Sequence, residues 1–195
     1  MNCLLKCGNK KLSNKIGIWN LPRSTCINAG VCKDYCYAKS FENMKYPKKF
    51  RESRLEISKT DLFEKLMIAE IKNNKFKYIR IHESGDYYSI KYFVKWINIA
   101  KACPNVTFLS FTKSFNILDL NGLPNNFTIF QSYGSKTDSE IDVNLNTARV
   151  IDNINQLNSN EFLCPYHDKA FTKCGEYCNY CWTLGVNKKV AFLKH

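Results

Sequence analysis

Ten cysteines constrain this 195-residue chain more than any other feature. Seven of them fall into two groups. The first cysteine group is Cys26, Cys32 and Cys36, and the second cysteine group is Cys164, Cys174, Cys178 and Cys181. A chain of this length, with 45% hydrophobic residues, can bury a core without covalent cross-links. Closely spaced cysteines in a reducing compartment are metal ligands more often than disulfides, so we interpret both groups as metal sites.

The chain carries no recognisable export or membrane signal. Lys6 and Gly8 interrupt the N-terminus before an apolar run reaches signal-peptide length, and no later segment approaches about 18 uncharged apolar residues. We therefore expect a cytoplasmic protein without membrane association. No repeat or linker divides the sequence, which predicts a single domain over residues 1–195. This domain carries an N-terminal cluster loop (26–38) and a C-terminal cysteine cluster (164–182).

The two cysteine groups differ in the coordination that they can provide. Three thiolates from one loop can hold three irons of a 4Fe-4S cluster and leave the fourth iron open. Four thiolates within eighteen residues can close a coordination shell, either of a second 4Fe-4S cluster or of a structural zinc ion. The first group is also open to another interpretation, as buried or zinc-binding cysteines.

The other cysteines and one histidine give weaker signals. Cys3 and Cys7 lie near the N-terminus and could supply a further ligand. Cys103 precedes a proline, and we expect it to be buried at a helix end. His167 lies close to Cys164 and could coordinate metal or transfer protons, but a plain hydrogen-bonded histidine is the interpretation that we favour.

Segments of strand and helix character alternate along the chain. Apolar runs predict strands at 16–21, 78–82, 106–111, 127–133, 148–151 and 161–164. The basic segment 46–58 is expected to be helical, and helical spacing predicts helices at 60–73, with Thr60 as its cap, and from Ser89 to just before Pro104. This alternation favours the α/β class, with either a doubly wound sheet or a partial (β/α) barrel of about six mainly parallel strands with iron-sulfur-binding loops. Chemistry in such folds gathers at the carboxyl ends of the strands, where we expect both cysteine groups.

The strand at 78–82 carries the strongest candidates for catalysis. Side chains alternate across a strand, so its two isoleucines should face the helices while Arg80 and His82 point together to the other side. Buried charge without a partner is costly, so this pair, followed by Asp86, suggests a functional site. A structural Arg80–Asp86 ion pair with a hydrogen-bonded His82 is the alternative. Lys113, at the end of a later strand, could bind a carboxylate or phosphate.

The chain is strongly basic. Its 29 basic and 17 acidic side chains give a net charge of +12. This balance suggests an anionic small molecule or a nucleic acid as partner, and a solvated lysine-rich surface is the alternative.

An iron-sulfur loop after the first strand of an alternating chain resembles the radical S-adenosylmethionine superfamily. There, a three-cysteine loop holds a 4Fe-4S cluster whose open iron is chelated by S-adenosylmethionine. Tyr35 resembles the aromatic residue before the last cysteine of that loop. Ser84-Gly85-Asp86 resembles the glycine-rich acidic motif that receives the amino group of the methionine.

This resemblance implies reductive cleavage of S-adenosylmethionine to a 5'-deoxyadenosyl radical, with a reductant protein as partner. Cys174, Cys178 and Cys181 have the spacing usual in the superfamily, but only fourteen residues follow them. We therefore assign the open cluster to the first cysteine group and an auxiliary cluster to the second.

Scattered segments also resemble a family of phage-encoded proteins known by a gene-product number, whose reaction is unsettled. The matching segments are 8–12, 21–22, 25–26, 36–38, 80–82, 84–86, Trp96, 112–113 and 181–182.

Two functions follow from these patterns. The first is an iron-sulfur enzyme that uses S-adenosylmethionine, acting on a nucleotide or nucleic-acid substrate. The second is a non-enzymatic nucleic-acid-binding module stabilised by zinc or iron-sulfur clusters, whose affinity should fall steeply with salt.

Overall fold

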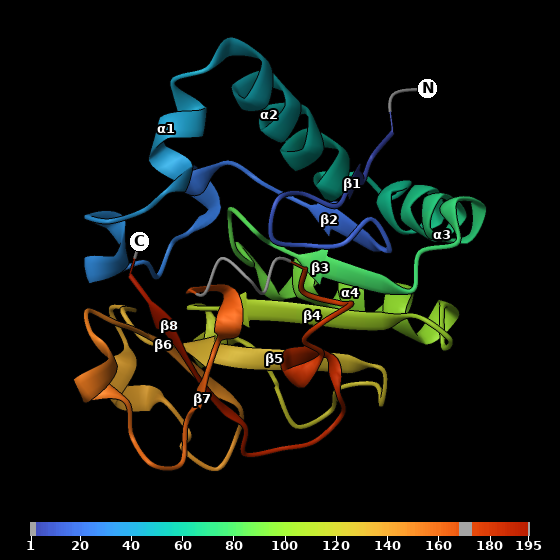
Figure 1. The fold of residues 1–195 in the computed structure, drawn as a ribbon. Coiled ribbons are helices and arrows are strands. Elements are labelled where there is room, and N and C mark those ends of the chain that lie inside the picture. The colour runs from blue at the N-terminus through green and yellow to red at the C-terminus, as the bar shows by residue number, and fades with distance from the viewer. Residues whose placement is uncertain (1–2, 168–172, 195) are drawn as a thin grey trace.

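A computed structural model describes residues 3–167 and 173–194, and in them one eight-stranded sheet organises the chain. The strand order is β1-β2-β3-β4-β5-β6-β8-β7, and the sheet is not closed (Figure 1). Only β1 and β2 pair antiparallel; all the other neighbours are parallel. The strands are β1 (Lys6–Cys7), β2 (Ile16–Trp19), β3 (Tyr78–Ile81), β4 (Thr107–Thr112), β5 (Phe127–Ser132), β6 (Thr147–Ile151), β7 (Phe162–Leu163) and β8 (Lys189–Leu193).

The sheet confirms the predicted α/β class and all six predicted strands, with ends shifted by a few residues. Strands β1 and β8 were not predicted. Strand β8 inserts between β6 and β7, pairing Val190 with Ala148 on one side and with Phe162 on the other. Its five residues become a strand only through these long-range pairings.

The α-helices precede β3 and β4. They are α1 (Ala38–Glu42), α2 (Lys45–Lys59), α3 (Phe63–Asn74) and α4 (Ile90–Ala102). The Ser89 hydroxyl accepts a hydrogen bond from the Tyr92 backbone N–H, which confirms the predicted cap of α4. The predicted cap at Thr60 is wrong, because its hydroxyl donates backwards to the carbonyl of Ile57 at the end of α2. No helix in the described part of the chain has the length and apolar character needed to cross a membrane.

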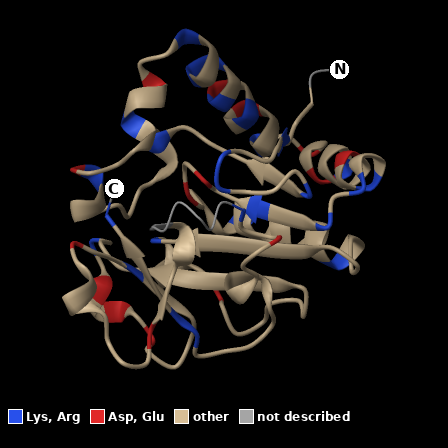
Figure 2. Ribbon diagram, viewed as in Figure 1, with Lys and Arg blue, Asp and Glu red and all other residues tan. Residues whose placement is uncertain are grey.

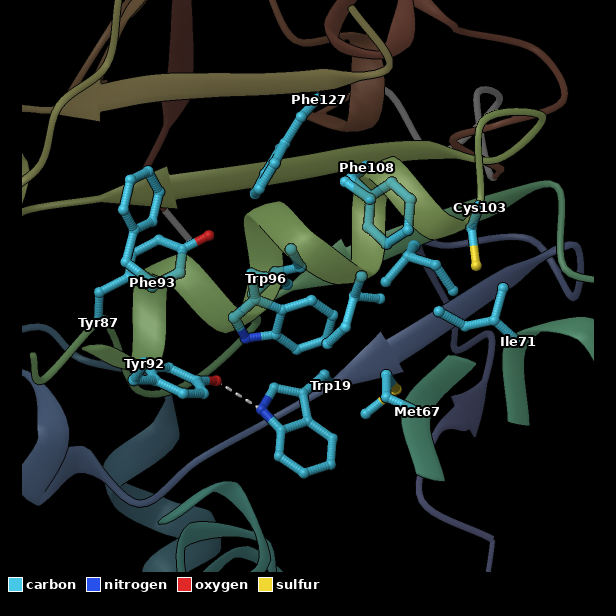
Figure 3. Close-up of a cluster of buried hydrophobic side chains, with 14 of the residues drawn as sticks. Trp19, Met67, Ile71, Tyr87, Tyr92, Phe93, Trp96, Cys103, Phe108 and Phe127 are labelled. Atoms are coloured by element: carbon cyan, nitrogen blue, oxygen red, sulfur yellow. Dashed lines mark hydrogen bonds between the residues drawn. The ribbon is translucent and has the colours of Figure 1, made fainter. Parts of the chain in front are cut away.

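Helices α3 and α4 cover one face of the sheet and enclose the larger core (Figure 3). Trp19 from β2 packs against Trp96 of α4 and Phe63 of α3, with ring centroids 6.1 Å and 5.2 Å apart. The indole N–H of Trp19 donates to the Tyr92 hydroxyl at 2.8 Å. Cys103 is 4% exposed at the end of α4, as predicted.

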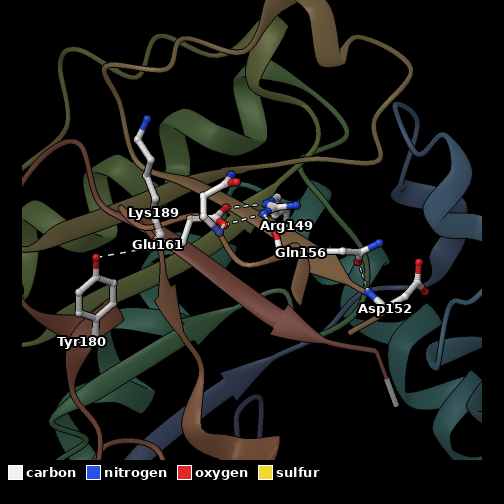
Figure 4. A network of polar contacts seen from close by, with 7 residues as sticks. Arg149, Asp152, Gln156, Glu161, Tyr180 and Lys189 are labelled. Carbon is white, nitrogen blue, oxygen red and sulfur yellow. Dashed lines mark hydrogen bonds and ion pairs between the residues drawn. The ribbon is translucent and has the colours of Figure 1, made fainter. Parts of the chain in front are cut away.

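The C-terminal segment covers part of the opposite face (Figure 1). There Trp182 packs on Tyr78 at the start of β3, with ring centroids 4.8 Å apart. The paired strands β6, β8 and β7 are held by Arg149, whose guanidinium forms two hydrogen bonds of 2.5 Å and 2.6 Å with the carboxylate of Glu161 (Figure 4). This pair fastens the segment before β7 to β6, so it stabilises the three strands in which β8 lies between β6 and β7.

Candidate functional site

The first cysteine group lies on a loop that crosses the carboxyl ends of the parallel strands. The Gly30 N–H donates to the carbonyl of Gly134, after β5, at 2.9 Å, and Ala29 forms an isolated bridge with Ser135. A β-carbon at Gly30 would lie 2.7 Å from the Ser135 carbonyl oxygen, so only glycine permits this approach. These contacts fix the loop at the carboxyl ends of the strands, where the sequence predicts the functional site.

Ser84-Gly85-Asp86, the turn after β3, packs directly on this loop. The Ser84 hydroxyl donates to the Leu21 carbonyl at 2.9 Å, and the Asp86 N–H donates to the Thr25 hydroxyl at 3.1 Å. Gly85 has a φ of +84°, and an added β-carbon would lie 2.6 Å from the Leu21 β-carbon. The structure thus brings together two motifs that are almost sixty residues apart in the chain.

Asp86 ties this turn to the end of β4. Its carboxylate accepts hydrogen bonds from the Tyr87 N–H (2.8 Å), the Thr112 hydroxyl (2.6 Å) and the Lys113 N–H (2.8 Å). Burial raises the Asp86 pKa, and these three donors oppose the rise. The Arg80–Asp86 ion pair considered as an alternative is not formed among the described residues.

Lys113 also lies beside the first cysteine group. Its ammonium donates to the Ser132 hydroxyl at 2.8 Å. Burial raises the pKa of the Cys26 thiol to about 12, with a further rise from the Asp86 carboxylate, whereas the Lys113 charge lowers it. Lys113 lowers the pKa of the Cys32 thiol in the same way, against the larger effect of burial. Binding metal here would require these thiols to lose their protons.

Tyr35 lies at the outer edge of this loop. Its ring is 40% exposed, and the Lys194 ammonium lies 5.4 Å from the ring centroid. Its hydroxyl is 3.3 Å from the position of a β-carbon built on Gly134, on the loop after β5. Tyr35 therefore accompanies the loop of the first cysteine group, as its place in the sequence suggests.

Arg80 and His82 point in different directions, so the prediction that they share one face is wrong. Arg80 faces away from α3 and α4, with its guanidinium 4.2 Å from the Phe111 ring centroid. His82 follows the last residue of β3 with a φ of +61°, which breaks the alternation of the strand. Its Nε2 is 2.9 Å from the Tyr92 hydroxyl, and its ring packs on Tyr87 among the helix-side aromatics. Burial, assisted by Arg80, lowers the His82 pKa to about 3.

The second cysteine group lies on the face of the sheet opposite α3 and α4. Cys164 follows the carboxyl end of β7, but Cys174 lies beside Leu12, before β2, so the prediction that the whole group gathers at the carboxyl ends is wrong. Cys174 forms an isolated bridge with Leu12, and its sulfur accepts a hydrogen bond from the Trp182 indole at 3.2 Å. Gly175 packs against Ile16, at the start of β2. This placement depends on long-range pairing of the C-terminal segment, which strand alternation does not reveal.

Arg80 reaches from the sheet towards the second cysteine group. Burial lowers the pKa of its guanidinium, while Tyr37, Cys181 and Glu83 act in the opposite direction. Burial also raises the pKa of the Cys181 thiol to about 12, and Arg80 opposes that rise. Arg80, Cys181 and Tyr37, which directly follows Cys36, line the same cavity.

A cavity of about 780 Å³ opens between α1, α2 and the C-terminal segment. All four cysteines of the second group line it, together with Arg80, Glu83 and Tyr37. Sequence reasoning did not single out Lys11, Phe111 or Phe192, which also line it. Alternation along β4 and β8 could have indicated on which face of the sheet Phe111 and Phe192 lie, but not that their rings contact each other.

The thiols of the described cysteines are not arranged around a common metal position. Among residues 3–167 and 173–194, no three or more His, Cys, Asp or Glu side chains are placed to hold a metal ion. No disulfide joins any of the ten cysteines in the described chain. Cys3 donates to Glu70 and Cys7 to the Asn14 carbonyl, away from both groups. A role for the His167 side chain falls outside the described parts of the structure.

A family model described as gene product 88 matches residues 3–189. The chain belongs to the gene product 88 family. This result agrees with the resemblance to a phage-encoded family, and the match is not to a radical S-adenosylmethionine family. No curated protein and no solved structure matches the chain significantly.

Proposed function

We propose that this member of the gene product 88 family is an iron-sulfur enzyme of the radical S-adenosylmethionine type. Cys26, Cys32 and Cys36 would hold an open 4Fe-4S cluster, and the second cysteine group an auxiliary one. The observation that carries the proposal is the contact between the turn Ser84-Gly85-Asp86 and the loop of Cys26. This contact lies at the carboxyl end of the second parallel strand, beside the three thiols.

The donor set suits the proposed group. The loop supplies three thiols and no fourth, which is the set an open cubane requires. Lys113 is near enough to lower two of their pKa values, so it would also help to stabilise the thiolates. When bound, the cluster and S-adenosylmethionine would supply one-electron chemistry and hydrogen abstraction. The chain itself positions the loop and the neighbouring turn.

The proposal includes a finer description of the sheet, as a partial (β/α) barrel. Strands β2, β3, β4, β5 and β6 are neighbours in their chain order, without the reversal that marks a doubly wound sheet. Catalytic sites of barrels lie at the carboxyl ends of the strands, which is where the loop of the first cysteine group crosses.

Anaerobic purification followed by iron and acid-labile sulfide analysis tests the metal assignment. We expect iron and sulfide in the wild-type protein, less of both in Cys26→Ser and Cys181→Ser, and unchanged amounts in the controls Cys103→Ala and Cys7→Ser. Zinc without sulfide would contradict the proposal and favour the metal-stabilised nucleic-acid-binding module.

Turnover is a separate test. With dithionite and S-adenosylmethionine, the reconstituted wild-type protein should form 5'-deoxyadenosine, and Cys26→Ser should not. Absence of both product and S-adenosylmethionine binding from a sample that contains iron and sulfide would refute the radical mechanism.

A further inference from the structure

The cavity lined by the second cysteine group has an excess of basic side chains, as has the chain as a whole (Figure 2). Its volume of about 780 Å³ is within the range of small-molecule sites. Among the described residues that line it, Glu83 is the one acidic side chain, and its carboxylate accepts hydrogen bonds from the side-chain amides of Asn9 and Asn20. The basic side chains are Lys6, Lys10, Lys11, Arg51, Arg80 and Lys173. Such a cavity attracts an anion.

Arg80 has hydrogen-bonding capacity left for this anion. No carboxylate lies within 4.0 Å of its guanidinium in the described structure, and its bond to the His82 carbonyl is long, at 3.5 Å. Lys11 lies 4.8 Å from the Phe192 ring centroid, and that ring meets Phe111, beneath Arg80, edge to face at 5.5 Å. Lys11 and Arg80 thus lie over two aromatic rings that contact each other in the wall of the cavity. A guanidinium can bind phosphate through two parallel N–H groups.

The lining of the cavity also includes exposed aromatic rings. Tyr37, Phe41, Phe50 and Tyr177 line it and are 40–69% exposed. Arg54 lies over the Phe50 ring at 3.0 Å from its centroid, which fixes this ring from one side. Exposed rings of this kind stack on planar bases at a gain of about 1–3 kcal/mol per base.

From this combination we infer that the cavity binds a nucleoside monophosphate, with the phosphate at Arg80 and Lys11 and the base against the exposed rings. The inference rests on the proposed function in treating the ligand as the enzyme's substrate. It also places that substrate beside the second cysteine group and beside Tyr37, the residue after Cys36, because Tyr37, Arg80 and Cys181 line the same cavity.

Equilibrium dialysis of the anaerobically purified full chain tests this inference, with adenosine and thymidine monophosphates as probes. Inorganic phosphate, the free nucleosides and a single-stranded oligonucleotide serve as comparisons. We expect a monophosphate to bind at least tenfold more tightly than phosphate or its own nucleoside. Arg80→Gln should weaken binding roughly ten- to hundredfold, and Arg80→Lys should weaken it less. Lys91→Gln, which removes one positive charge on α4, is the control and should leave binding unchanged.

Three results would overturn the inference. The first is monophosphate binding no tighter than that of phosphate. The second is equal affinity in Arg80→Gln and wild type, with both folded by circular dichroism. The third is preferred binding of the oligonucleotide that Arg80→Gln leaves intact. Iron and sulfide content, measured on the same samples, separates the two proposals. A sample with both but without nucleotide binding refutes only this inference, whereas nucleotide binding without iron and sulfide refutes only the proposed function.

Discussion

Replacing Gly85 by alanine should damage the junction between the first cysteine group and the turn after β3. The new β-carbon would lie 2.6 Å from the Leu21 β-carbon and 2.8 Å from the Thr25 hydroxyl oxygen. The φ of +84° costs an L-residue about 1–2 kcal/mol, and the overlap adds about 1–3 kcal/mol. The sum, about 2–5 kcal/mol, is a large part of the 5–15 kcal/mol by which ordinary domains are stable.

Urea unfolding followed by circular dichroism measures this cost, and iron per chain reports on the site. Gly122→Ala is the matched control, because the nearest atom to its β-carbon is an Asp119 carboxylate oxygen at 3.5 Å. We expect Gly85→Ala to unfold at markedly lower urea and to retain less iron, with Gly122→Ala close to wild type. Equal unfolding midpoints and equal iron in the two variants would show that Gly85 does not hold the turn against the loop.

Three further predictions concern the rest of the fold. The His82 pKa is lowered to about 3, so the unfolded state gains a proton near pH 6.5 that the folded state does not bind. The wild type should therefore lose about 1.4 kcal/mol of stability per pH unit more than His82→Asn as pH falls below 6.5, and parallel curves would contradict this. Glu161→Gln should cost about 1–2 kcal/mol at pH 7, because Arg149 lowers the pKa of this carboxyl. That loss should vanish as pH falls through the carboxyl range, and a difference that persists at low pH would argue against the ion pair. Ser89→Ala should cost about 1 kcal/mol in urea unfolding by removing the cap of α4, whereas Ser89→Gly should cost less.

The sequence alone determined the local elements and the motif at the sheet edge. Apolar runs and helical spacing located six strands and the helices that became α3 and α4, and the basic segment 46–58 was expected to be the helix that became α2. The rule that chemistry lies at the carboxyl ends of parallel strands placed the first cysteine group beside Ser84-Gly85-Asp86. These features depend on the conformational preferences of neighbouring residues and on the location of functional sites at the carboxyl ends of parallel strands. The order of residues in the sequence is therefore enough to predict them.

Only the tertiary structure decided how Arg80, His82 and the second cysteine group are arranged. A single positive φ at His82 turned its ring into the helix-side core, and no pattern of residue types reveals that dihedral angle. Strand β8 is positioned by its pairing with β6 and β7, and the second cysteine group packs on the face of the sheet opposite α3 and α4. The cavity exists because distant segments pack together, and the free energy of that packing depends on contacts that no local window of sequence contains.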